Sequence, residues 1–135
     1  MRQINEVMRR DVKVASPDQT IREAASIMAQ SDIGSLPVGE NDRLIGMLTD
    51  RDIALRAVAE GRDPETPVRA VMTGAIRYCF DDEDVSDVAK NMADLGVRRL
   101  PVVDRDKRLV GIVSLANIAL CEDGASTETL LGGVA

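Results

Sequence analysis

The chain has 135 residues, 44% of them apolar, which is enough for one compact domain with its own core. Its formal net charge is −6, which argues against a general nucleic-acid-binding protein, because such proteins present a basic face. The chain has no histidine, so no Ser–His or Cys–His nucleophile and no His-ligated metal site can form.

The first half of the chain predicts a short helix, a strand, a helix, two strands and a final helix. Its β-rich runs are Val12–Ala15, Leu36–Gly39 and Leu44–Thr49. Apolar side chains recur at helical spacing after the first run, at Ile21, Ala24, Ala25 and Met28. Thr20 and Glu23 have the spacing of a capping box, which places the start of that helix. The last helix is predicted near Asp50–Glu60.

The second half predicts the same order of elements. Its β-rich runs are Ile76–Cys79, Leu100–Val103 and Leu109–Ser114. Helical spacing follows the first of them, at Val85, Val88, Ala89, Met92 and Leu95. Gly34 and Gly96 fall near the predicted ends of the two longer helices. A closing helix is predicted near Leu115–Cys121.

These elements divide the chain into two units. We expect residues 1–61 to form the first unit, including the short N-terminal helix, and residues 68–121 to form the second. Residues 62–67 contain Pro64 and Pro67, which is typical of a linker. The tail, residues 122–135, has no clear period, so we expect it to be mobile or to dock on a partner.

The two units repeat each other in sequence. Three short segments recur at nearly constant spacing: Val7-Met8 as Val71-Met72, Leu36-Pro37-Val38 as Leu100-Pro101-Val102, and Arg43-Leu44-Ile45-Gly46 as Arg108-Leu109-Val110-Gly111. A single unit of about 55 residues is marginally stable, and two units can bury their sheets together. The repeat therefore predicts a pseudo-twofold axis that relates the two halves.

The repeated segments resemble those of the CBS-domain family, specifically a stand-alone tandem pair (a Bateman module). The resemblance is carried by Asp32–Val38, Leu44–Ile53, Val97–Asp104 and Leu109–Ser114. It implies an α/β (α+β) fold of two CBS repeats, each a small sheet packed against two helices. It also implies a disc-like homodimer. Its ligands would be adenosine compounds (AMP, ADP, ATP, NAD or S-adenosylmethionine) bound in clefts between the repeats.

One candidate ligand site lies where the strand ending at Thr49 turns into a helix. The Thr49 hydroxyl and the free N–H groups of that helix start would face the same space, which favours a phosphate. Asp52 shares the helix face and can accept hydrogen bonds from ribose hydroxyls, while Arg51 can bind phosphate. Gly46 allows close approach of the backbone. The same residues also suit a helix N-cap with an acidic first turn, which needs no ligand.

The second copy departs from this pattern. Ser114 keeps the hydroxyl, but Asn117 replaces the acid, so a ribose would be bound less strongly. We therefore expect this second site to be weaker or empty.

The resemblance implies further contacts. The adenine would lie against Val12, Lys13, Val14, Ile33, Leu36 and Pro37 in the first half, and against Ile76, Arg77, Tyr78, Val97 and Pro101 in the second. Pro37 and Pro101 can equally be strand-edge residues. Arg98 and Arg99 would meet phosphates, across the cleft or from a partner chain; alternatively the pair is solvated or salt-bridged.

The favoured function is a regulatory module that senses an adenosine ligand, with no catalysis and no required cofactor. The alternative is a dimeric protein-interaction module without a ligand, to which an effector protein binds. An enzyme is disfavoured, because no nucleophile–base pair stands out. The acidic run Asp81–Asp84 is interpreted as a solvated face or as acids at a helix start, not as a metal site. Two unpatterned cysteines and the lack of a long apolar run predict a cytoplasmic protein that does not enter a membrane.

Overall fold

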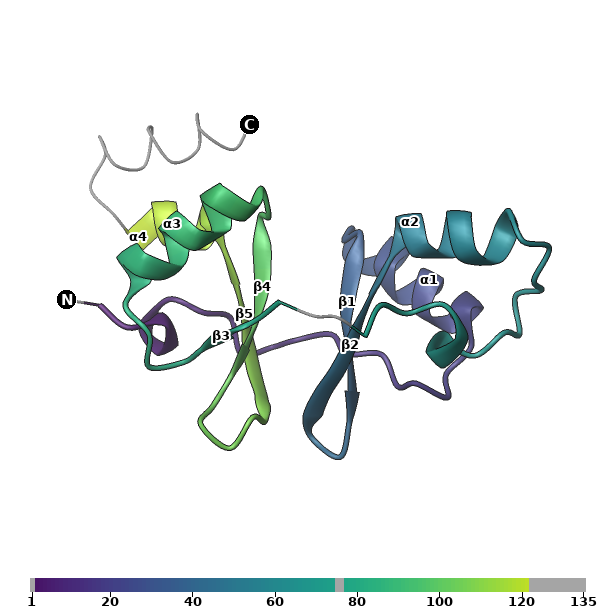
Figure 1. Ribbon diagram of the computed structural model, residues 1–135, viewed down its shortest axis with the longest axis horizontal. Helices are drawn as coiled ribbons and strands as arrows, with labels where there is room; N and C mark the ends of the chain where they lie inside the picture. Colours follow the sequence, from purple (N-terminus) through teal and green to yellow (C-terminus); the bar gives the residue numbers. More distant parts are fainter. Residues whose placement is uncertain (1, 75–76, 122–135) are drawn as a thin grey trace. The chain divides into compact units, whose positions relative to one another are not determined.

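The computed structural model describes residues 2–74 and 77–121, which belong to two compact units of mixed α/β structure (Figure 1). The central unit is formed by Lys13–Ile76, the middle of the sequence. The terminal unit combines Met1–Val12 with Arg77–Ala135. The tail expected at residues 122–135 lies outside the described residues. Within the described residues, no helix has the length and apolar character needed to cross a bilayer.

The central unit is built on an antiparallel hairpin of β1 (Ser35–Glu40) and β2 (Arg43–Thr49). Asn41 and Asp42 form its turn with positive φ angles of 55° and 65°, as a tight hairpin turn requires. The hairpin packs against α1 (Ile21–Ser31), and the chain leaves β2 directly into α2 (Asp50–Asp52). That helix continues as the π-helical segment η2 (Ile53–Val58), within the helix predicted near Asp50–Glu60.

The terminal unit has a three-stranded sheet in the order β3–β4–β5. Its strands are β3 (Cys79–Phe80), β4 (Arg99–Val103) and β5 (Leu109–Ser114). The helices α3 (Val85–Leu95) and α4 (Leu115–Cys121) complete the unit. Both hairpins, β1–β2 and β4–β5, change register at equivalent places, between Val38 and Gly39 and between Val102 and Val103, where one residue of the second strand, Ile45 or Val110, has no pairing partner.

The first predicted strand of each half is wrong in extent. Val12–Ala15 forms no strand: only Ala15 pairs, through a single parallel bridge with Val38. Ala15 is fully buried, whereas Lys13 and Val14 are exposed, so only Ala15 is held against the hairpin by the core. In the second half β3 begins at Cys79, later than predicted, and Ile76 lies outside the described residues.

The N-terminal helix packs in the terminal unit, although in sequence it belongs to the repeat expected over residues 1–61. It is the short 3-10 helix η1 (Ile4–Glu6), and its Ile4 is fully buried among residues of the terminal core. The backbone N–H groups of Ile4 and Asn5 donate to the carbonyls of Glu83 and Asp81 at 2.9 Å. The equivalent helix, η3 (Val68–Ala70), packs in the central unit, where Val68 is fully buried. Thus η1, from the first repeat, completes the core of the terminal unit, and η3, from the second repeat, completes the core of the central unit.

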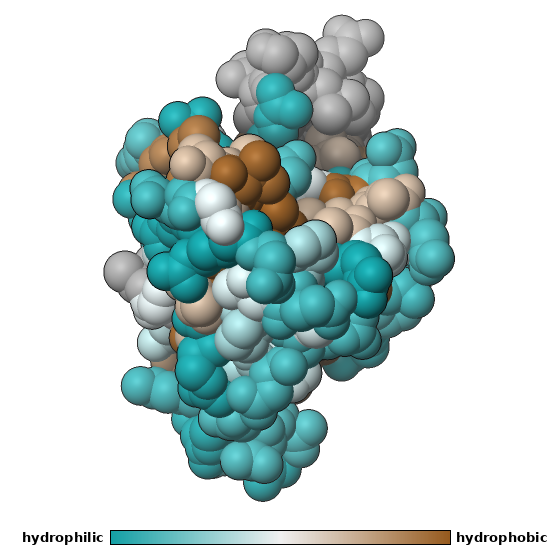
Figure 2. Space-filling model, turned by 90° about the vertical axis from the view of Figure 1, so that its right-hand side faces the viewer, coloured by the Kyte–Doolittle hydropathy of each residue, from teal (hydrophilic) through white to brown (hydrophobic). Residues whose placement is uncertain are grey.

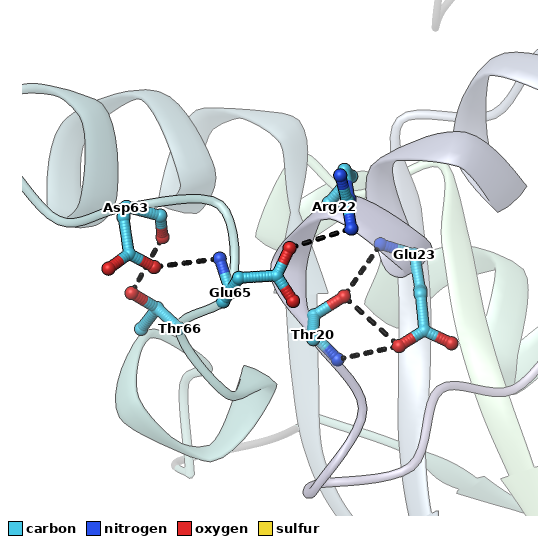
Figure 3. A network of polar contacts seen from close by, with 6 residues as sticks. All are labelled: Thr20, Arg22, Glu23, Asp63, Glu65 and Thr66. Atoms are coloured by element: carbon cyan, nitrogen blue, oxygen red, sulfur yellow. Dashed lines mark hydrogen bonds and ion pairs between the residues drawn. The ribbon is translucent and has the colours of Figure 1, made fainter.

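The predicted linker, residues 62–67, is part of the central unit. Its Thr66 and Pro64 carbonyls accept hydrogen bonds from the N–H groups of Ile21 and Arg22, which satisfies donors at the start of α1. Figure 3 shows polar side-chain contacts at the same place, where Glu65 pairs with Arg22 at 2.7 Å. The predicted capping box is confirmed, because Thr20 and Glu23 bond each other through side chain and backbone (Figure 3). The chain leaves the central unit only at Ile76–Arg77.

The two long helices end in left-handed residues, as C-terminal caps commonly do. Gly96 ends α3 with φ 71°, as its position in the sequence suggests. Asp32, and not Gly34, ends α1 with φ 52°. Gly34 instead lies two residues beyond that cap, directly before β1, where it takes part in the site described next.

Candidate ligand-binding site

The β2–α2 corner, Thr49–Asp52, is held by a capping box. The Thr49 hydroxyl accepts a hydrogen bond from the Asp52 N–H at 2.9 Å. In return Asp52 Oδ2 accepts one from the Thr49 N–H at 3.0 Å. The helix-cap interpretation of these two residues is therefore realised in the fold. It leaves the second carboxylate oxygen of Asp52 and the hydroxyl proton of Thr49 for other contacts.

The start of α2 offers no free backbone donors, contrary to the expectation from the sequence. The Asp50 N–H donates to the Gly34 carbonyl at 2.9 Å. The Arg51 N–H donates to Oδ1 of the neighbouring Asp50 at 2.8 Å. With the Asp52 N–H bound to Thr49, each of these three groups has a partner within the central unit. A phosphate at this corner would have to displace one of them.

Two side chains that the sequence argument did not single out shape this corner. The carboxylate of Asp50 lies over Gly34: a Cβ atom on that glycine would be 3.1 Å from Asp50 Oδ2. Arg56 lies one helical turn beyond Asp52, with its Nε 3.9 Å from Asp52 Oδ1, and its Nη1 donates to the Met72 carbonyl at 3.2 Å. The i,i+4 spacing of Asp52 and Arg56 is the sequence signal that predicts this pair.

Gly46 provides the close approach expected of it, but to a segment of its own unit. A Cβ there would lie 2.9 Å from both the Met72 sulfur and the Thr73 carbonyl. Met47 and Thr73 exchange backbone hydrogen bonds of 3.0 and 2.8 Å alongside. The lack of a side chain at Gly46 therefore allows residues 72–73 to pack directly against β2.

The other predicted contacts of the central unit differ in exposure. Lys13, Val14 and Arg51 are exposed, and Ile33 is half-buried. Leu36 is fully buried in the core and offers no surface to a ligand. Pro37 is buried within the hairpin, where its carbonyl accepts the Ala15 N–H, so its position is explained by the sheet alone.

The β5–α4 corner, Ser114–Asn117, repeats the capping arrangement in the terminal unit. The Asn117 N–H donates to Ser114 Oγ at 3.0 Å, and the two side chains are also hydrogen-bonded to each other. The Leu115 N–H donates to the Arg98 carbonyl at 3.0 Å, which is the counterpart of the Asp50–Gly34 bond. The residue equivalent to Asp50, however, is the buried Leu115, so residues 114–117 carry no carboxylate.

The remaining predicted residues of the terminal unit are mostly at its surface. Arg98 and Arg99 are exposed, and neither forms an ion pair with any residue that the structure describes. Tyr78 is 37% exposed and meets Phe80 edge-on, with ring centroids 5.7 Å apart. Val97 is half-buried and Pro101 is buried.

The expected site residues are thus shared between the two units. The central unit holds Lys13, Val14, Ile33, Leu36, Pro37, Thr49, Arg51 and Asp52; the terminal unit holds Val12, Arg98, Arg99, Pro101, Ser114 and Asn117. The expectation that Arg98 or Arg99 meets a ligand bound at Thr49 stays a prediction.

Comparison with known proteins identifies the chain. A family model for the CBS domain matches residues 4–58 and again residues 68–121. The chain belongs to the CBS domain family. The CBS domain-containing protein YhcV of Bacillus subtilis (strain 168) is 46% identical to it over 120 residues, which is 89% of this chain and 85% of that protein.

Two solved structures show the same fold. The crystal structure of Hypoxic Response Protein I with two coordinated zinc ions shares 35% identity, with a TM-score of 0.80 over 90% of this chain and all of that one. The CBS domain pair of MJ0100, in complex with 5′-methylthioadenosine and S-adenosyl-L-methionine, shares 27% identity, with a TM-score of 0.73 over 100% of this chain and 99% of that one. In the present CBS pair, residues 2–74 and 77–121 bring no three His, Cys, Asp or Glu side chains together as metal ligands.

Proposed function

We propose that this CBS pair is a non-catalytic regulatory module that binds an adenosine-containing ligand through its strand-to-helix corners. One observation carries the proposal: the same hydroxyl-based corner occurs in both repeats of a chain similar over its full length to MJ0100, a CBS pair crystallised with two adenosine compounds. AMP, ADP, ATP, NAD and S-adenosylmethionine all contain the adenosine that such corners would recognise.

Each corner residue has a role in this proposal. Asp52 Oδ1 accepts a hydrogen bond from a ribose hydroxyl, because Oδ2 is held by the Thr49 N–H. The exposed Val14 and the half-buried Ile33 contact the adenine, and the exposed Arg51 reaches the outer part of the ligand. In the terminal unit Ser114 and Asn117 form the weaker counterpart, next to Arg98 and Arg99.

Regulation would follow from differential binding. A ligand shifts a conformational equilibrium only by the difference in its affinity for the two states. We propose that the module works as a homodimer in the cytoplasm and passes this shift to an effector protein. The surface offered for self-association is the exposed side of η2, where Leu55 is 49% and Val58 72% exposed.

Thermal melting of the purified protein against a panel of adenosine compounds tests the proposal. A ligand at a hundred times its dissociation constant adds about 2.7 kcal/mol, which is a shift of several degrees in a chain of this size. Asp52→Ala should cost about 1.5–3 kcal/mol of binding, as expected for a charged hydrogen bond. Asp42→Asn, which removes an exposed charge at the far end of the hairpin, should leave the shift unchanged. No shift with any compound would contradict ligand binding.

The second candidate is a protein-interaction module without a ligand. The apolar surface of the central unit favours it: Figure 2 shows apolar side chains gathered in the upper part of the face in view. A partner recovered equally well by the wild type and by Asp52→Ala, with no melting shift in either, would support this function over nucleotide sensing.

A further inference from the structure

The two corners are built alike but differ in charge. The central corner carries two carboxylates, Asp50 and Asp52. At the equivalent positions of the terminal corner stand Leu115 and Asn117, which are uncharged. The residue that precedes the first hairpin strand also differs, because Gly34 in the central unit corresponds to the exposed Arg98 in the terminal unit.

The carboxylate of Asp50 is fixed where a negatively charged ligand group would have to lie. Its Oδ1 accepts the Arg51 N–H, a donor that a phosphate would otherwise use, at 2.8 Å. Its Oδ2 lies over Gly34, where the absence of a side chain leaves room for it. Arg51 carries the opposite charge, but at the end of a long exposed side chain, where water screens it.

We propose that Asp50 determines the ligand class of the central corner: it disfavours a 5′-phosphate and admits adenosine compounds whose 5′ substituent is uncharged or cationic. The inference rests on the proposed function, in which Asp52 binds the ribose and Arg51 reaches the outer part of the ligand, so that the 5′ group lies at the start of α2. A phosphate there would meet a like charge within a few ångströms and no free backbone N–H on residues 50–52. The sulfonium of S-adenosylmethionine or the thioether of 5′-methylthioadenosine meets neither obstacle.

The test is a pair of NMR titrations that follow the backbone amide signals of residues 49–53, so that only the central corner is read. The probes are AMP and 5′-methylthioadenosine. The variants are Asp50→Asn, which keeps the acceptor oxygen without the charge, and Asp50→Ala, which removes both. Asp42→Asn is the matched control, since it removes one exposed carboxylate of the same unit at the hairpin turn.

The wild type should bind 5′-methylthioadenosine more tightly than AMP. Asp50→Asn and Asp50→Ala should raise AMP affinity about tenfold, as expected when a like charge a few ångströms away is removed, and change that of 5′-methylthioadenosine by less than about twofold. The gain for AMP should shrink at high salt, because screening weakens the repulsion that Asp50 exerts.

Two results would overturn the inference in distinguishable ways. If both probes bind but neither Asp50 variant changes their affinity ratio beyond that of Asp42→Asn, Asp50 does not select the ligand, although the proposed function stands. If neither probe shifts the corner signals of the wild type, the central corner binds neither class of compound and the inference fails, whereas the proposed function is judged by the whole panel of the melting experiment.

Discussion

Thr49 and Ser114 have the same local role in the two repeats. Each ends a hairpin strand, and its hydroxyl accepts the N–H three residues on, at 2.9 Å for Asp52 and 3.0 Å for Asn117. This bond satisfies a donor that the start of a helix leaves without an intrahelical partner. The corners are therefore rigid before any ligand arrives, which reduces the entropy lost when one binds.

Thr49→Ala tests the structural role of this hydroxyl. Removing an N-cap side chain costs about 1 kcal/mol, so the free energy of unfolding should fall by that amount in urea titrations. Thr49→Ser keeps the hydroxyl and is the matched control, with a loss smaller than that of Thr49→Ala. Equal losses in the two variants would show that the hydroxyl does not stabilise the corner.

Cys79 is a buried thiol whose chemistry is set by its surroundings. It is 3% exposed, and burial, aided by the charges of Glu83 and Asp81, raises its pKa from 9.0 to about 12. Since the unfolded chain loses this proton at a lower pH than the folded one, the free energy of unfolding should fall as the pH rises from 9.0 towards about 12.

Alkylation measures the same property directly. Below pH 9.0, iodoacetamide should modify Cys79 slowly in the folded protein and rapidly in urea, as followed by peptide mass spectrometry. Replacing Cys79 with Val should flatten the alkaline part of the stability profile. Fast modification of Cys79 in the folded protein would contradict its burial.

At the scale of elements, each hairpin is closed by a segment from outside it. Residues 72–73 lie against Gly46 of β2, and residues 8–9 lie against Gly111 of β5. In both places a Cβ on the glycine would collide with a backbone carbonyl, at 2.9 Å from Thr73 and 2.7 Å from Arg9. The repeated glycine of the sequence is thus required by the way the sheets are completed.

Gly46→Ala should lower the free energy of unfolding by about 1–3 kcal/mol, the usual cost of overpacking, because the Thr73 carbonyl cannot move aside as a flexible side chain can. Gly74→Ala is the matched control, since a Cβ at that position would meet nothing within 4 Å. Urea unfolding of the two variants gives the comparison, and equal stability of the two would refute the close-approach argument.

At the scale of the whole molecule, compact units and sequence repeats do not coincide. Ile4, near the N-terminus, is fully buried in the terminal unit, and Val68, its counterpart in the second repeat, is fully buried in the central unit. A core substitution near the start of the chain should therefore weaken the terminal unit, most of which is formed by the second half of the sequence.

Amide hydrogen exchange distinguishes this arrangement from the one expected by sequence order. Ile4→Ala, which costs about 2–5 kcal/mol as a large-to-small core substitution, should speed exchange in α3 (Val85–Leu95) more than in α1 (Ile21–Ser31). Val68→Ala should do the reverse. Faster exchange in α1 after Ile4→Ala, with α3 unaffected, would contradict the division into central and terminal units.

The sequence by itself determined the elements that local chemistry specifies. Apolar periodicity predicted α1 and α3, the runs before Asn41 and Asp104 predicted the hairpins, and Thr20 with Glu23 predicted a helix start. The internal repeat and the resemblance it carries predicted the family, which the family model confirms. These features depend on residues close together in the chain, so a single sequence contains their signal.

Only the tertiary structure decided which segment completes which core and which partners the backbone N–H groups of the central corner have. Each of the helices η1 and η3 packs in the unit that holds the hairpin of the other repeat. This placement depends on backbone hydrogen bonds between residues distant in sequence, such as that from the Ile4 N–H to the Glu83 carbonyl. Because backbone N–H and C=O groups do not depend on the side chain, the sequence contains no signal for these bonds. At the central corner, the Asp50 N–H is bound by the carbonyl of Gly34, which is distant from α2 in sequence and adjacent in space, whereas the Arg51 and Asp52 N–H groups are bound by neighbouring side chains. Periodicity and motif spacing report local order, and contacts of this kind are set by the packing of the whole unit.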